Sequence, residues 1–201
     1  MQVEFINEDN FIKYKFKTKP YKHQYDAFLK CKDKEAYALF MEQGTGKSKV
    51  IIDNIAYLYR KGKIDTAIIA APKGVYRNWL SSEFKTHMSD DVKELTDICV
   101  WSPNETKSNV EMLINFLKPS HKLKFFIINI EALSTDKGKN YLHRLLNTSA
   151  SFFCIDESTT IKHRTARRTK SVLKLGRLAK FRRILTGTPV TQGPLDLWSQ
   201  I

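Results

Sequence analysis

The feature that most constrains this chain is a glycine-rich turn at residues 44–48, with the sequence Gly-Thr-Gly-Lys-Ser. The apolar run 36–40 precedes the turn, and residues 50–59 after it carry apolar side chains at helical spacing. A strand, a tight turn and a helix in this order can hold the phosphates of a nucleotide. Glycine lets backbone N–H groups point inward, and the N-terminus of the helix attracts anions.

Two side chains of this turn have the chemistry that a nucleotide site needs. Lys47 can reach the β- and γ-phosphates, and Ser48 supplies a hydroxyl group for Mg²⁺. The match is partial, because the full phosphate-loop pattern begins with a glycine and this chain has Met41 at that place. A glycine-rich turn that binds nothing is the alternative.

Short apolar runs alternate with amphipathic segments through most of the chain, which predicts an α/β fold. Strands are expected at 36–40, 66–70, 98–101, 124–130, 152–155 and 183–186, and helices at 23–31, 50–59, 75–84, 103–117, 141–146, 165–178 and from 194 onward. The expected sheet is mostly parallel, with helices on both faces and the carboxyl ends of its strands along one edge. A small N-terminal β-hairpin is expected within residues 3–16, ending before Pro20.

The composition narrows the class of protein. With 42% hydrophobic and 27% charged residues, the 201-residue chain is typical of one soluble globular domain. No apolar run reaches the length of a membrane span, so no membrane partner is expected, and the first residues lack the pattern of a secretion signal. Cys31, Cys99 and Cys154 are expected to be reduced core residues of an intracellular protein. A net charge of +13 favours a polyanionic partner.

Asp156 and Glu157 form a second group with catalytic chemistry. They follow the apolar run 152–155, which is expected to deliver both carboxylates to the sheet edge that holds the glycine turn. Phosphoryl transfer to water needs one carboxylate to hold Mg²⁺ and a second group to orient or deprotonate the water. We assign Asp156 to the first role and Glu157 to the second. An acidic pair on a solvated loop is the alternative.

Three motifs stand in a fixed order along the chain: 41–48 (Met-Glu-Gln-Gly-Thr-Gly-Lys-Ser), 154–157 (Cys-Ile-Asp-Glu) and 185–190 (Leu-Thr-Gly-Thr-Pro-Val). Together they resemble the first RecA-like motor domain of superfamily 2 helicases, and most of all the Swi/Snf branch of double-stranded nucleic-acid translocases. Shorter matches lie at 21–24, 71–73, 78–79, 83–84, 161–162 and 195–198. The resemblance implies a RecA-like, helicase ATP-binding domain over 21–201, after an N-terminal β extension over 1–20.

The resemblance also implies that ATP is the nucleotide hydrolysed and that Mg²⁺ is the cofactor. The implied catalytic residues are Lys47, Asp156 and Glu157, and the implied Mg²⁺ ligands are Ser48 and Asp156. Gln24 is expected to hydrogen-bond the adenine edge. The implied ATP-binding set is Gln24, Glu42, Gln43, Gly44, Thr45, Gly46, Lys47 and Ser48. Coupling of hydrolysis to movement is assigned to Thr186, Gly187 and Thr188.

Double-stranded DNA is the implied partner. The resemblance places Pro72, Lys73 and Asn129 along the nucleic-acid backbone. A basic run then follows the acidic pair, and its expected phosphate contacts are Lys162, Arg164, Arg167 and Arg168. Such contacts position a protein without reading bases. The alternative is a solvated helix face. Trp79 and Trp198 are expected to be packing residues rather than base-stacking ones.

The chain departs from the family pattern at one point of its acidic motif. Ser158 and Thr159 follow the acidic pair, where the family often has alanine or glycine and then histidine. That histidine links the ATP site to the threonine motif, so we expect the link to run through Thr159 or another group. The Asp-Glu-Ser-Thr form resembles motor proteins of bacteriophages, which implies the cytoplasm of a bacterium or of a phage-infected host.

Motors of this type place ATP between two RecA-like domains, and no second set of motifs follows in these residues. We therefore expect the chain to be the ATP-binding half of a motor, weakly active alone, whose partner domain belongs to the same polypeptide. Two alternatives remain open at this point: a phosphate-loop kinase or nucleotide switch, and a non-catalytic nucleic-acid-binding module with the same fold.

Overall fold

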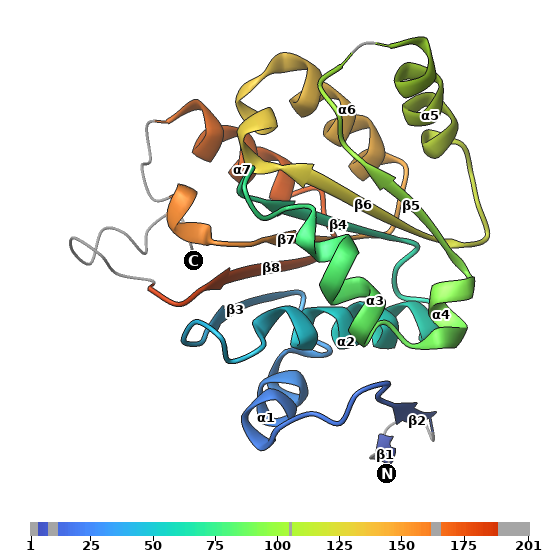
Figure 1. Ribbon diagram of the computed structural model, residues 1–201, viewed down its shortest axis with the longest axis vertical. Coiled ribbons are helices and arrows are strands. Elements are labelled where there is room, and N and C mark those ends of the chain that lie inside the picture. The colour runs from blue at the N-terminus through green and yellow to red at the C-terminus, as the bar shows by residue number, and fades with distance from the viewer. Residues whose placement is uncertain (1–3, 8–11, 105, 162–165, 189–201) are drawn as a thin grey trace.

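A six-stranded parallel sheet forms the centre of the protein (Figure 1). The structure is a computed structural model that describes residues 4–7, 12–104, 106–161 and 166–188. In sheet order the strands are β3 (Ala36–Phe40), β8 (Phe181–Thr186), β7 (Ser151–Ile155), β4 (Thr66–Ala71), β6 (Leu123–Asn129) and β5 (Thr96–Val100). Each neighbouring pair is parallel, which confirms the predicted sheet.

Helices cover the sheet on both faces, as predicted (Figure 1). One face carries α1 (Lys22–Cys31), α2 (Lys47–Arg60), the π-helix η1 (Trp79–Phe84), α3 (Lys85–His87) and α4 (Asp90–Glu94). The other carries α5 (Lys107–Leu117), α6 (Asp136–Asn147), α7 (Arg167–Gly176) and the 3-10 helices η2 (Ile130–Ser134) and η3 (Ser158–Ile161).

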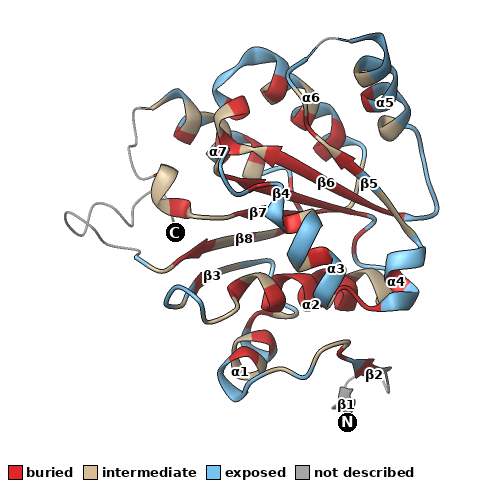
Figure 2. Cartoon of the chain, in the orientation of Figure 1, coloured by how far each residue is buried: buried red, intermediate tan, exposed pale blue. Residues whose placement is uncertain are grey.

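Two hydrophobic cores lie on the two faces of the sheet, and the strand period of two divides residues between them. Along β4, Ala67, Ile69 and Ala71 belong to the core under α1 and α2, whereas Ile68 and Ala70 belong to the core under α6 and α7. Every residue of β4 is buried, as expected for a central parallel strand (Figure 2). The three cysteines are buried and free, which confirms their prediction as reduced core residues.

The predicted N-terminal hairpin is present and is joined to the domain. Its strands β1 (Glu4–Asn7) and β2 (Ile12–Lys15) pair in antiparallel fashion. Tyr14 and Phe16 are buried in the core under α1 and α2. The Tyr14 hydroxyl donates to Asp53 O over 2.9 Å, and Asp53 forms an almost fully buried ion pair with Lys49 (2.6 Å). Tyr14 in the second strand of the hairpin and Phe16 just after it are therefore packed into the core of the domain.

An internal arginine fixes the end of α1. Arg183 lies on β8, is 1% exposed, and donates hydrogen bonds to Cys31 O (2.7 Å) and to Asn54 Oδ1 (3.1 Å). A cation at the last carbonyl groups of a helix also complements the helix dipole. This contact ties the strand before the threonine motif to both α1 and α2.

Three helices start four or five residues away from the expected position. The helix expected over 75–84 starts at Trp79, because residues 73–77 form turns in which Pro72 O accepts from Val75 N and Tyr76 N. The helix expected from 103 starts at Lys107, after the Thr106 cap. The helix expected over 141–146 runs from Asp136 to Asn147, because Thr135 caps it. In the part of the chain that the structure describes, none of the helices has the length and apolar character to cross a membrane.

Candidate nucleotide-binding site

The glycine turn joins β3 to α2 in the conformation expected of a phosphate loop. Gly44 and Gly46 have φ angles of 76° and 80°, in the left-handed region that favours glycine, and Gly46 is the N-cap of α2. A Cβ atom added to Gly46 would lie 2.3 Å from Gln24 Nε2. The backbone conformation therefore favours glycine at this position, and a larger residue would also displace the Gln24 amide.

Gln24 lies under the loop and attaches it to α1. Its side chain is 6% exposed, its Oε1 accepts from Tyr21 N (3.0 Å), and its Nε2 donates to Thr45 O (3.0 Å). His23 Nε2 also lies 3.0 Å from Thr45 O. The loop is thus held by two neighbouring side chains of one helix. The adenine contact of Gln24 stays a prediction, and the loop contact is a feature that the sequence did not predict.

Lys47 is the first residue of α2, and its side chain folds back over the loop. Its Nζ donates to Met41 O (2.9 Å) and to Glu42 O (3.0 Å). These acceptors are neutral carbonyl groups, and a hydrogen bond between an ammonium and a phosphate is the stronger kind. A phosphate in the loop would therefore compete favourably for Lys47. Ser48 follows as the second residue of the helix.

The acidic pair lies at the same edge of the sheet as the loop. Asp156 and Glu157 follow β7, and only β8 separates β7 from β3. Burial raises the pKa of Asp156, and the Lys47 charge acts in the opposite direction. The pKa of Glu157 is raised by burial and by the Asp156 charge, and Lys47 again opposes the shift. The structure therefore brings Lys47, Asp156 and Glu157 into electrostatic contact.

The backbone at the acidic pair is strained. Glu157 has a φ of 51°, the one non-glycine residue with positive φ among those the structure describes. Its N–H donates to Asp156 Oδ1 (3.0 Å). Backbone strain of this kind costs about 1–3 kcal/mol and persists only where the surrounding contacts impose it.

A tryptophan completes the contacts of Asp156. Trp79 Nε1 donates to Asp156 Oδ2 over 2.9 Å, so each carboxylate oxygen accepts one hydrogen bond. Trp79 is 2% exposed, which confirms its prediction as a packing residue. The hydrogen bond was not predicted. The available signal was the Asn-Trp pair at 78–79, which belongs to the motifs shared with the Swi/Snf branch.

The threonine motif packs against the phosphate loop. Thr186 is fully buried at the end of β8, its O accepts from Met41 N (3.3 Å), and its Oγ1 accepts from Thr188 N (3.0 Å). A Cβ atom on Gly187 would lie 3.2 Å from Gln43 N. The two motifs are therefore in direct contact. Pro189 and Val190 of this motif, and the helix expected from 194, lie outside the described residues.

Those residues predicted to contact nucleic acid that the structure describes lie at the same edge of the sheet as the phosphate loop. Pro72 and Lys73 follow β4 and Asn129 ends β6, its side chain donating to Glu131 Oε2 (3.4 Å). Lys73 is exposed, as is Arg167 at the start of α7, and Arg168 is half-buried. Lys162 and Arg164 lie outside the described residues.

The donor groups at this edge fit Mg²⁺. The Ser48 hydroxyl and the Asp156 carboxylate are hard oxygen donors, which Mg²⁺ prefers. Among the described residues, no group of three His, Cys, Asp or Glu side chains forms a metal cage of its own. Mg²⁺ typically binds through one or two carboxylates and the phosphates of its substrate. The residues present therefore suit a metal that arrives with a nucleotide.

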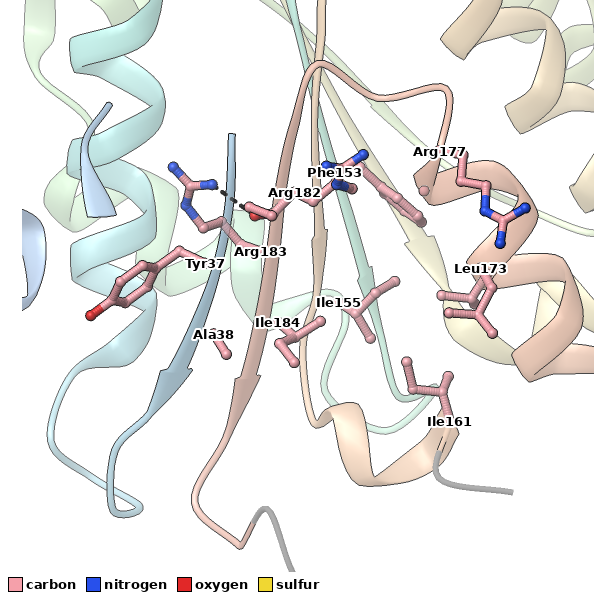
Figure 3. Close-up of a pocket in the computed structure, with 13 residues that line it drawn as sticks. Tyr37, Ala38, Phe153, Ile155, Ile161, Leu173, Arg177, Arg182, Arg183 and Ile184 are labelled. Atoms are coloured by element: carbon pink, nitrogen blue, oxygen red, sulfur yellow. Dashed lines mark hydrogen bonds between the residues drawn. The ribbon is translucent and has the colours of Figure 1, made fainter. Parts of the chain in front are cut away.

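A separate groove of about 470 Å³ lies on the open face of β3, β8 and β7, next to α7 (Figure 3). Ile155, Ile184 and Leu173 line it with apolar side chains, and Arg177 and Arg182 stand at its upper end in this view. Of the described residues that line the groove, none comes from the phosphate loop or the acidic pair. The groove is therefore distinct from the site described above.

The family model described as "SNF2-related domain" matches residues 23–201. The chain belongs to the SNF2-related family. This membership confirms the resemblance to the Swi/Snf branch and favours the helicase-type motor over the kinase and the non-catalytic module.

Two curated relatives of this SNF2-related chain are much longer than it is. The probable ATP-dependent DNA helicase CHR12 of Arabidopsis thaliana is 30% identical over 159 residues, which are 79% of this chain and 13% of the relative. The SWI/SNF-related matrix-associated actin-dependent regulator of chromatin subfamily A containing DEAD/H box 1 of Homo sapiens is 26% identical over 158 residues, 79% of this chain and 14% of the relative.

Among solved structures, the SWI2/SNF2 ATPase core of Sulfolobus solfataricus in complex with dsDNA is similar to the SNF2-related chain. It superimposes with a TM-score of 0.69 at 20% sequence identity, covering 92% of this chain and 35% of that one. The likeness confirms the expected RecA-like α/β fold.

Proposed function

We propose that the chain is the ATP-binding half of a motor that hydrolyses ATP and moves on double-stranded DNA. The observation that carries the proposal is the meeting of the phosphate loop, the acidic pair and the threonine motif at one sheet edge. Two similar proteins support DNA as the partner. One relative is a probable ATP-dependent DNA helicase, and one solved structure is an ATPase core in complex with dsDNA. The net charge of +13 suits such a partner.

The residues of the loop would bind the triphosphate. Backbone N–H groups of residues 44–47 and the N-terminus of α2 would hold its oxygens, and Lys47 would exchange two carbonyl partners for the β- and γ-phosphates. Ser48 and Asp156 would hold Mg²⁺. When bound, the metal neutralises the negative charge that develops on the transferred phosphoryl group.

Glu157 would act on the attacking water. Its carboxylate would orient the water and accept its proton, and the raised pKa of Glu157 makes it a better base than an exposed carboxylate. Thr186 and Gly187 contact the loop and would respond to its occupant. We further propose that Lys73 and Arg167 contact the DNA backbone, and that a second RecA-like domain of the same polypeptide completes the catalytic site. Hydrolysis by the chain alone would then be weak.

The proposed location is the cytoplasm of a bacterium or of a phage-infected host. The Asp-Glu-Ser-Thr sequence of the acidic motif supports it.

The test compares ATP hydrolysis by the full-length polypeptide with double-stranded DNA, single-stranded DNA and RNA. We expect stimulation by the duplex. We expect Lys47→Ala to lose binding of the ATP analogue AMP-PNP, and Glu157→Gln to retain binding while hydrolysis falls by at least 10². The control is Lys93→Ala, an exposed lysine on α4. Unchanged turnover in the Glu157 variant would remove this residue from the base role, and transfer of phosphate to small acceptors would favour a kinase instead.

A further inference from the structure

We infer, resting on the proposed function, that Trp79 is a positioning residue for the magnesium site, because its indole N–H fixes the orientation of the Asp156 carboxylate. Two donors hold this carboxylate from two directions. Glu157 N donates to Oδ1 (3.0 Å), and Trp79 Nε1 donates to Oδ2 (2.9 Å). With one bond on each oxygen, rotation of the carboxylate would break both contacts.

The indole is itself held rigidly. Trp79 is 2% exposed and belongs to the core between the sheet and α2. It opens the π-helix η1, which contacts both α2 and α3. π-helical turns are rare and are found frequently at functional sites. The donor therefore has little freedom to follow a moving carboxylate, and it imposes one orientation.

The strands also bring the two residues together. Trp79 follows β4, and Asp156 follows β7, which is the parallel neighbour of β4. The ladder continues past the strand, since Asp156 N donates to Ala70 O (2.8 Å). The backbone of Asp156 is thus anchored to the strand that leads into the Trp79 loop. The indole adds the side-chain contact that the backbone cannot supply.

The hydrogen bonds leave Asp156 able to act toward a metal. A carboxylate offers about four lone-pair directions, and the two donors use two of them. An indole N–H can only donate, so it supports a charged carboxylate and leaves the remaining lone pairs to a cation. Glu83, on the same π-helix, brings a further carboxyl group near Asp156, and burial and the Asp156 charge raise its pKa. The indole is the neutral donor that offsets this crowding of negative charge.

The test measures binding of AMP-PNP to the chain by calorimetry, once with Mg²⁺ and once with EDTA. In Trp79→Phe the ring stays apolar and aromatic but the donor is lost. We expect its affinity in EDTA to equal that of the wild type, and its half-saturating Mg²⁺ concentration to rise about tenfold, the usual effect of losing a partner of a metal ligand. A role limited to packing would change both conditions equally.

The matched control is Trp101→Phe, which removes an equally buried indole (2% exposed) from the other core. We expect it to match the wild type in both conditions. If Trp79→Phe fails to fold, benzothienylalanine at position 79 keeps the ring shape and replaces N–H by sulfur. Equal Mg²⁺ dependence in wild type and in the variant that lacks the donor would overturn the inference while leaving the proposed function intact. A wild-type chain that does not bind AMP-PNP at all would overturn both.

Discussion

Replacing Gly46 with alanine should destabilise the chain more than the same replacement at Gly44. The φ angles of the two glycines are nearly equal, 76° at Gly44 and 80° at Gly46. The left-handed backbone therefore costs alanine about 1–2 kcal/mol at either position. The surroundings differ, because an added Cβ meets nothing within 4 Å at Gly44 but would lie 2.3 Å from Gln24 Nε2 at Gly46.

The additional cost at Gly46 follows from the contacts of Gln24. To make room, the buried amide must move away from the loop, and it then loses its hydrogen bonds to Tyr21 N and Thr45 O (3.0 Å each). A net hydrogen bond contributes about 1 kcal/mol to stability. We therefore expect Gly46→Ala to lose about 3–4 kcal/mol, and Gly44→Ala about 1–2 kcal/mol.

Urea denaturation of the single variants, followed by circular dichroism, measures this difference. Gln24→Ala removes the clashing side chain, so Gly46→Ala in that background should cost no more than Gly44→Ala does in the wild type. An equal loss at the two glycines, or a Gly46 cost that Gln24→Ala does not reduce, would refute the reasoning from the clash.

Three further predictions concern ionisable side chains. Arg183→Met removes the donor to two buried acceptors and should cost about 1–3 kcal/mol in urea denaturation, whereas Arg182→Met, at the groove, should cost less; equal losses would contradict the role of the buried contacts. Lys49→Ala leaves the Asp53 carboxyl group buried without its ion-pair partner and should cost about 3–5 kcal/mol; a loss near zero would show that Asp53 is stable without a cation beside it. The pKa of His87 is lowered to about 4, by burial and by nearby lysines. Because protonation then favours the unfolded state, the stability that His87 contributes is complete above about pH 6.5 and is lost as pH falls toward 4. In His87→Gln, the melting temperature measured by thermal denaturation should depend less on pH over that window. An unchanged dependence on pH would exclude His87 as the cause.

The sheet and the loop were predictable because their signals are local. Each strand of the parallel sheet is an apolar run with turn residues after it, and the phosphate loop is one contiguous sequence. The position of Asp156 at the loop's edge followed from strand polarity alone. Parallel strands end at one edge whatever their order, so this prediction did not depend on knowing the order β3-β8-β7-β4-β6-β5.

The contacts that hold the site were not predictable from spacing. Trp79 and Asp156 lie 77 residues apart and Gln24 and Thr45 lie 21 apart, so each bond depends on how separate elements pack. The π-helical turn at Trp79 has no periodic pattern of its own in the sequence. Helix starts were missed for a related reason, since the Thr135 hydroxyl caps α6 six residues before the expected apolar pattern begins.

The same contacts show how little the site must change when a nucleotide enters. Gln24 and His23 already hold the loop through Thr45 O, and Asp156 already has a donor on each oxygen. Lys47 differs from these groups, because its ammonium is bound to Met41 O and Glu42 O, two carbonyl oxygens that a phosphate would replace. Ordering the other side chains therefore adds little entropic cost at binding. Most of the adjustment on binding is therefore made by Lys47, whose ammonium exchanges two neutral carbonyl groups for negatively charged phosphate groups.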